Sequence, residues 1–199
     1  MNPPVYPRDR INAVLVRTEL PPCYRIVPRR YVGSPLGTAP ADSRFCSKIG
    51  VFTMLYVSPD FATSFIEVVM RDRFVQRRRR EIMLKEVTER AWASIATKPG
   101  MRLSVLDLRK DGCALIGART DTVNARNHAA GRAFGKTMHA DHEDVDGMVY
   151  ASRLTGADVY AVFDRAFGKL EPRVVGMLSE HPRLPSVLAK HGISLIFEQ

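Results

Sequence analysis

A carboxylate on an otherwise apolar helix is the feature of this sequence that points most directly to chemistry. The segment from Phe61 to about Arg71 has helical periodicity, and Glu67 is its only ionisable residue between Asp60 and Arg71. At about 100° per residue, Glu67 points roughly 200° away from the apolar stripe. Because a lone charge is costly to bury, Glu67 must reach solvent, a cleft or a cationic partner. The stripe consists of Phe61, Phe65 and Val69.

Three further side chains, Arg25, Tyr56 and Ser152, are of types that bind or position ligands. Arg25 stands at the edge of a short apolar strand, and Tyr56 lies on the strand that leads into the Glu67 helix. Ser152 ends an apolar strand predicted over residues 147–151. Each also has an ordinary structural explanation: a surface ion pair for Arg25, a core aromatic for Tyr56 and a turn residue for Ser152. Spacing alone leaves both interpretations open.

The elements that position these side chains are predicted to be short strands mixed with a few helices. This pattern predicts an α+β fold in a single compact domain. Besides the Glu67 helix, helices are predicted over residues 122–140, with one small-residue face against a sheet, and over 184–190. The predicted strands cover residues 54–57, 90–96, 101–106, 147–151, 159–163 and 193–197.

The first part of the chain differs in composition from the rest. Residues 1–22 contain five prolines, which predicts an N-terminal arm with one strand at 13–16. Residues 23–199 then form the domain that carries the candidate residues. Within it, residues 24–52 are rich in Gly, Pro and Ser, which favours irregular structure with short strands. Segments of this kind often carry binding residues.

Composition places the chain among ordinary globular proteins with a basic surface. Thirty Lys and Arg residues against 21 Asp and Glu give its 199 residues a net charge of +9. An apolar content of 45% excludes disorder, and three widely spaced cysteines exclude a disulfide scaffold and suit a reducing cytoplasm. The longest uncharged run near the middle, residues 49–59, is far shorter than the roughly 20 residues of a membrane span. Residues 1–10 lack the apolar region of a secretory signal, so we expect a cytoplasmic protein without membrane contact.

An arginine-rich stretch is the strongest local charge feature. Six arginines fall within residues 71–80. No aromatic residue lies between Arg77 and Arg80 to stack on bases, and no zinc-finger or helix-turn-helix pattern accompanies them. Three interpretations stay open: a solvated helix end or loop, a surface for an acidic protein, and a nucleic-acid contact. The last two define a function of another class, a non-catalytic basic module that binds nucleic acid or protein.

His139 and His142 superficially resemble a metal site, because three acidic residues lie among and after them. Their spacing matches no zinc motif, and the cysteines are distant in the sequence. A polar loop at a helix end explains this cluster better. We therefore expect no bound metal.

Two motif halves give the sequence a family resemblance. The first half comprises Tyr24-Arg25, Arg44-Phe45 and the run from Leu55 to Asp60 that leads through Ala62 to Glu67; the second comprises Asp146 to Arg153, followed by Val159 to Asp164. Together they resemble a RES domain over about residues 24–164. That family is named after an Arg, a Glu and a Ser, and the resemblance implies that these are Arg25, Glu67 and Ser152 here. The usual Gly-Gly-Arg stretch before the Leu-Tyr strand is replaced by Ser43-Arg44-Phe45-Cys46-Ser47.

The resemblance implies a toxin of a bacterial toxin–antitoxin pair, with a fold similar to the ADP-ribosyltransferase toxins. It implies NAD+ as substrate, with cleavage by hydrolysis or phosphorolysis and depletion of cellular NAD+, and no metal. The alternative is a mono-ADP-ribosyltransferase that modifies a host protein. It also implies a cognate antitoxin with a helix-turn-helix DNA-binding part, so that nucleic acid is contacted only through that partner.

The resemblance also implies roles for individual side chains. Glu67, Arg25 and Ser152 are the implied catalytic residues: Glu67 stabilises an oxocarbenium-like ribose, Arg25 binds the pyrophosphate, and Ser152 bonds a phosphate or a ribose. Tyr56 stacks on nicotinamide. The implied NAD+-binding residues are Arg25, Tyr56, Tyr24, Tyr31 and Arg44.

Overall fold

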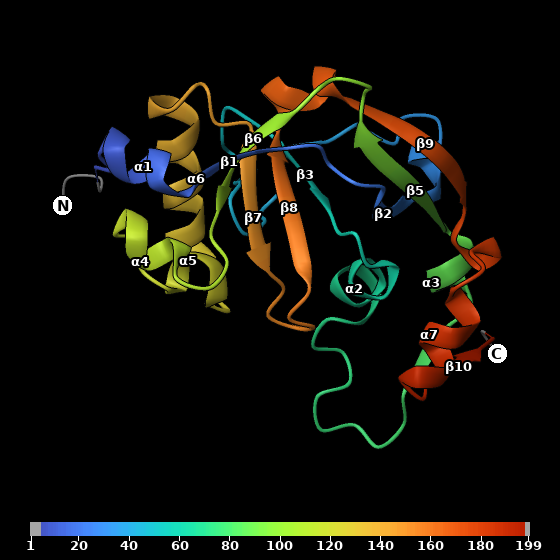
Figure 1. Cartoon of the computed structure of the whole chain (residues 1–199). Coiled ribbons are helices and arrows are strands. Elements are labelled where there is room, and N and C mark those ends of the chain that lie inside the picture. Colours follow the sequence, from blue (N-terminus) through green and yellow to red (C-terminus); the bar gives the residue numbers. More distant parts are fainter. Residues whose placement is uncertain (1–4, 198–199) are drawn as a thin grey trace.

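Three β-sheets form the framework of the protein, which is described over residues 5–197 by a computed structural model (Figure 1). The five-stranded sheet has the order β1 (Leu15–Thr18), β6 (Leu103–Asp107), β7 (Gly147–Ala151), β8 (Asp158–Phe163) and β3 (Met54–Val57). Its neighbours are antiparallel except for the parallel pair β6–β7. The other sheets are β2 (Cys23–Pro28), β5 (Arg90–Thr97) and β9 (Leu170–Met177), and the pair β10 (Ser194–Ile196) and β4 (Glu81–Met83).

The helices form two groups. One group covers a face of the five-stranded sheet, and the other lies at the opposite end of the molecule. The covering group is α1 (Arg8–Val14), α4 (Gly112–Ile116), α5 (Asp121–Asn124) and α6 (Ala129–Asp141) (Figure 1). The far end contains α2 (Phe61–Phe65), the π-helix η2 (Ile66–Met70), α3 (Lys85–Thr88) and α7 (Leu184–Lys190). Short 3₁₀ helices complete the chain: η1 (Arg29–Tyr31), η3 (Asp164–Lys169) and η4 (Leu178–Glu180). The predicted α+β fold is thus confirmed.

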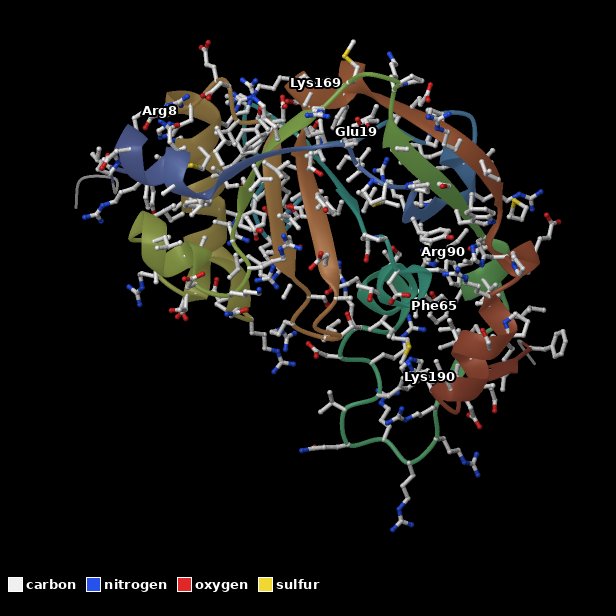
Figure 2. All side chains as sticks on the ribbon, viewed as in Figure 1. Arg8, Glu19, Phe65, Arg90, Lys169 and Lys190 are labelled. Atoms are coloured by element: carbon white, nitrogen blue, oxygen red, sulfur yellow. The ribbon has the colours of Figure 1, made fainter. Side chains whose placement is uncertain are left out.

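Alternate side chains of the central strands enter different hydrophobic cores. On β8, Val159, Ala161 and Phe163 pack under the helices, whereas Tyr160 and Val162 pack between the two larger sheets. Strands buried on both faces read as continuous apolar runs, which is why β7 and β8 are visible in the sequence. A third core surrounds α2 and α7, and Figure 2 shows Phe65 on α2 pointing toward it.

The two larger sheets are joined at the start of α2. Tyr24 on β2 and Ser58 after β3 exchange backbone hydrogen bonds of 2.7 and 3.1 Å. The Ser64 hydroxyl on α2 also donates to the Tyr24 carbonyl oxygen, at 2.8 Å. These bonds fix β2, the end of β3 and α2 side by side, so residues 25, 56 and 67 come from one junction.

Several elements differ from the sequence prediction. Within the described part of the predicted arm, residues 8–14 form α1 and residues 15–18 form β1, which pairs with β6; residues 1–4 lie outside the described part. Prolines before residue 8 favour an arm, but a proline also suits the start of a helix, and Pro7 is the N-cap of α1. The unpredicted strand β9 is an edge strand whose apolar pattern is interrupted by Pro172 and Arg173.

The helix predicted over residues 122–140 is divided into α5 and α6. Its small-residue face packs on a loop rather than on a sheet. A Cβ atom added to Gly131 would lie 2.3 Å from the Arg44 carbonyl oxygen, and one added to Gly135 would lie 2.1 Å from that of Phe45. Both distances are far below contact, so only glycine permits this approach. No helix within residues 5–197 is long and apolar enough to cross a membrane.

Acidification is expected to destabilise the protein through His181. This buried imidazole stacks on Phe61 at 3.5 Å and meets the rings of Tyr24 and Trp92 edge-on. Burial lowers its pKa to about 4, whereas an unfolded histidine titrates near 6.5. The unfolded state therefore binds the proton first, and this group lowers the free energy of unfolding as pH falls from about 6.5 to about 4. Urea unfolding at pH 7 and pH 5, with an NMR titration of the imidazoles, tests this; a His181 that titrates near 6.5 contradicts it.

Candidate active site

A cleft of about 660 Å³ opens at the junction of the two larger sheets. This volume lies within the range of about 300–1,000 Å³ that is typical of ligand sites. The residues predicted for the site that line it are Tyr24, Arg25, Arg44, Tyr56 and Glu67. Neither Ser152 nor Tyr31 is among the lining residues, but Ser152 is hydrogen-bonded to Glu67, which is.

Glu67 and Ser152 meet across 85 positions of sequence. The Ser152 hydroxyl donates to Glu67 Oε1 at 2.6 Å, and it accepts backbone N–H bonds from Leu154 at 3.1 Å and Thr155 at 3.3 Å. Ser152 is only 3% exposed. Since both N–H donors point at the oxygen, its proton is directed to the carboxylate. Ser152 thus holds the Glu67 side chain at the cleft wall.

The helix that carries Glu67 changes type just before it. Asp60 caps α2, with its carboxylate accepting from the N–H groups of Ala62 and Thr63. From residue 66 the helix becomes a π-turn and ends where the Arg71 N–H bonds the Ile66 carbonyl oxygen at 2.7 Å. Arg71 then has φ 42°, a conformation that is strained for a non-glycine residue. Such turns and strained residues concentrate at functional sites.

Arg25 reaches the cleft from β2, with part of its guanidinium already engaged. Its Nη1 donates to the carbonyl oxygens of Pro35 at 2.5 Å and Gly37 at 3.0 Å. Burial lowers the pKa of Arg25 to about 10, so it stays charged at neutral pH. Arg25 therefore fixes the 35–37 loop and brings a cation to the cleft.

Tyr56 and Arg44 are connected through the loop that precedes β3. The Tyr56 hydroxyl accepts the Phe45 N–H at 3.1 Å and shares a 2.8 Å hydrogen bond with the Ser43 hydroxyl. Burial raises the Tyr56 pKa to about 12, so it remains a neutral phenol. Arg44 donates to the Ala125 carbonyl oxygen at 3.2 Å.

The remaining predicted tyrosines occupy other places. The Tyr24 ring packs against Phe61 and Trp92, so its side chain belongs to the third core even though the residue borders the cleft. Tyr31 is 40% exposed, and the guanidinium of Arg30 lies 5.0 Å from its ring centroid.

Sequence reasoning missed several cleft residues. Tyr150 lies on β7, and Arg44 sits 5.6 Å from its ring centroid. Burial raises the Tyr150 pKa, and the nearby Glu67 carboxylate adds to this effect. In the sequence Tyr150 looks like a core residue because it is part of an apolar strand, and in the structure it is indeed only 5% exposed. The other missed lining residues include Arg71, Asp72, Arg126, His128 and Arg153.

The cleft is electropositive. Its charged lining residues are five arginines and three carboxylates: Arg25, Arg44, Arg71, Arg126, Arg153, Asp42, Glu67 and Asp72. His128 adds no further positive charge at neutral pH, because its burial and the surrounding arginines lower its pKa. This arrangement suits an anionic ligand that brings a reacting group to the one carboxylate held by Ser152.

His139 and His142 have separate packing roles. The His139 ring stacks on Phe52 at 4.4 Å, and His142 is the buried C-cap of α6 near Arg8. Within residues 5–197 no group of three or more His, Cys, Asp or Glu residues is placed to hold a metal ion.

The chain is similar to known proteins over most of its length. The RES domain matches residues 22–185. A protein of Sinorhizobium fredii described as "Probable toxin y4kH" is 34% identical over 97 residues, which make up 49% of this chain and 75% of that protein.

The fold is also similar to a solved structure. The crystal structure of the MbcT–MbcA toxin–antitoxin complex of M. tuberculosis matches with a TM-score of 0.62 and 17% identity, covering 85% of this chain and 90% of that one. At this identity the likeness concerns the fold.

The family match runs from the start of β2 into α7, and the matched residues include Arg25, Glu67 and Ser152. Because it covers most of the chain, and because the two motif halves meet at one cleft, this protein belongs to the RES domain family.

Proposed function

We propose that this protein is the toxin of a toxin–antitoxin pair and that it cleaves the nicotinamide–ribose bond of NAD+. The observation that carries the proposal is the Glu67 carboxylate, held by Ser152 at 2.6 Å beside an arginine-rich cleft. Membership of the RES family and similarity to a protein described as a probable toxin support the biological role.

The proposed reaction breaks the bond between ribose C1′ and the nicotinamide nitrogen. The bonding electron pair stays with that nitrogen, so nicotinamide leaves as a neutral pyridine. The ribose becomes oxocarbenium-like, and the Glu67 carboxylate stabilises its positive charge and accepts a hydrogen bond from a ribose hydroxyl. The acceptor then bonds to C1′ with its own electron pair, and an acceptor that carries a proton on the bonding atom, such as water, loses that proton to solvent.

Binding of the anionic part of NAD+ is assigned to the arginines. Arg25 is proposed to hold the pyrophosphate with the guanidinium nitrogens that the 35–37 loop leaves available. Tyr56 and Arg44 are proposed to form the wall for the nicotinamide end, and Tyr150 joins them. In this site Ser152 positions Glu67, because the Ser152 hydroxyl already donates to Glu67 and accepts from the N–H groups of Leu154 and Thr155.

The acceptor distinguishes the possible enzyme classes. Water makes the protein a hydrolase, phosphate makes it a phosphorylase, and a protein side chain makes it a mono-ADP-ribosyltransferase. Incubation with NAD+, with and without phosphate, followed by mass spectrometry of nucleotides and host proteins, identifies the product. The absence of any NAD+ loss with folded protein would reject the proposal.

The proposed partner is a cognate antitoxin that covers the cleft near Arg25 and Glu67. An acidic or carboxylate-ended segment of that partner would occupy the place of the pyrophosphate. We also propose that its other part is a helix-turn-helix DNA-binding region. A complex whose cleft stays open to NAD+ would contradict this mode of inhibition.

Replacing the four arginines at positions 77–80 with glutamine is expected to leave NAD+ turnover nearly unchanged. Arg77, Arg78 and Arg79 are exposed on the irregular loop between η2 and β4, which projects from the molecule (Figure 1). None of the three lines the cleft, and neither does Arg80, which follows them and donates to the His191 carbonyl oxygen at 3.2 Å. Turnover of a folded variant with glutamine at positions 77–80 tests this expectation. A large loss of turnover would place the loop at the active site, whereas salt-dependent nucleic-acid binding with unchanged NAD+ would favour the non-catalytic binding module.

A further inference from the structure

One carboxylate holds two arginines together at the edge of the cleft. Asp72 Oδ2 accepts from Arg126 Nη2 at 3.2 Å and from Arg153 Nη2 at 3.5 Å. Asp72 follows the strained end of the π-helix, Arg126 lies between α5 and α6, and Arg153 lies between β7 and β8. All three line the same cleft as Glu67.

The two ion-pair contacts of Asp72 are long and exposed to solvent. Good charge-assisted N–H···O bonds are about 2.7–2.9 Å long, and both contacts to Asp72 exceed that length. The Arg126 side chain is 76% exposed, and both partners of the Arg153 contact are more than one third exposed. Exchange of Asp72 for another anion therefore costs little.

Positive charge next to this pair is not neutralised. Arg71 uses its Nε to bond the Glu67 carbonyl oxygen at 2.6 Å, while its terminal amino groups have no hydrogen bond or ion pair within residues 5–197. His128 lines the cleft here as well. Asp72 thus pairs with two guanidinium groups, while a third, that of Arg71, lines the same cleft.

We propose that Arg126 and Arg153 form a phosphate-binding subsite whose place is held by Asp72 in the free protein. A phosphate presents more acceptor oxygens than a carboxylate and suits the forks of two guanidinium groups at once. Binding releases Asp72 to solvent, and Arg71 is placed to add a further contact. The inference rests on the proposed function, since it assigns part of the NAD+ reaction to this corner.

Two sources could supply that phosphate. One is the diphosphate of the dinucleotide itself, and the other is a free phosphate that serves as acceptor. Arg25 reaches this cleft from β2, whereas the side chains of the subsite come from three other segments of the chain. The chemistry of recognition is the same for both sources.

Calorimetry with two probes, inorganic phosphate and ADP-ribose, tests the subsite on the full chain. Arg126→Gln is expected to weaken binding of at least one probe by about tenfold, the usual effect of losing a charge-assisted bond. Asp72→Asn is expected to tighten the same probe, because it removes the competing carboxylate. Arg78→Gln, which makes the same charge change on the exposed loop, serves as the control.

The pattern of binding identifies the source of the phosphate. If the substrate's diphosphate is bound here, Arg126→Gln weakens ADP-ribose, and the two probes compete. If free phosphate is bound, both probes bind together, and the variant raises the phosphate concentration needed for turnover. The inference is overturned if Arg126→Gln and Asp72→Asn, shown to be folded by melting, bind both probes like Arg78→Gln. Since binding is measured without turnover, this result is independent of whether NAD+ is cleaved.

Discussion

Glu67→Gln is expected to lower NAD+ turnover by roughly 10²–10³-fold, the usual cost of removing one electrostatic contact to a transition state. The substitution keeps the size of the side chain. It also keeps the contact with Ser152, because a serine hydroxyl donates to the amide oxygen of glutamine as it does to the carboxylate oxygen of Glu67. The charge that stabilises the oxocarbenium-like ribose is lost, and that charge matters only in the transition state. NAD+ affinity should therefore survive while turnover falls.

Turnover and NAD+ affinity are measured on protein shown to be folded by its melting temperature. Arg25→Ala is the informative contrast, because it should weaken NAD+ affinity through a ground-state contact. If Glu67 only held Ser152, its neutralisation would lower stability and leave turnover per folded molecule intact. A folded Glu67→Gln protein with wild-type turnover would eliminate the proposed mechanism.

Gly135→Ala is expected to destabilise the protein by about 1–3 kcal/mol, as overpacking of a close contact does. The added Cβ would lie 2.1 Å from the Phe45 carbonyl oxygen and 3.0 Å from the Phe45 carbonyl carbon, both in the backbone. Neither atom can swing aside as a side chain would. Alanine favours a helix over glycine by about 1 kcal/mol, and this gain is smaller than the upper end of the expected loss of stability.

The melting temperature should fall by roughly 2–4 °C for each kcal/mol lost in a chain of this size. NAD+ affinity should fall too, since a shift of Phe45 would move its chain neighbour Arg44, which lines the cleft. Gly168→Ala is the matched control, because a Cβ there has no neighbour within 4 Å. Equal melting temperatures for the two variants would show that α6 shifts away from the loop at no cost.

The parts of the fold that could be predicted are those with a strong local signal. The strands at residues 54–57 and 147–151 and the helix at 184–190 have the predicted bounds, because their apolar runs or periodicity are uninterrupted. The edge strand β9 was missed, since an exposed strand with Pro172 lacks that signal. The π-turn at residues 66–70 was missed as well, because it has the same apolar pattern as an α-helix.

The candidate site was predictable only in part. The resemblance names Glu67 and Ser152, and the structure brings them into contact. Their pairing depends on the end of β7 lying beside the π-helix η2, which no local pattern encodes. Arg126 and Arg153 look like solvated loop residues in the sequence for the same reason: only the folded chain brings them to Asp72.

The position of β1 bears on how this chain behaves when it is shortened. The family match begins at residue 22, yet β1 covers the outer edge of β6, and α1 contributes the buried side chains of Ile11 and Val14. A chain that begins at residue 22 would leave the N–H and C=O groups along β6 unpaired beside exposed apolar side chains. Such an edge pairs readily with the same edge of another molecule. We therefore expect the shortened protein to self-associate and precipitate, and light scattering of the two lengths at equal concentration would reveal it.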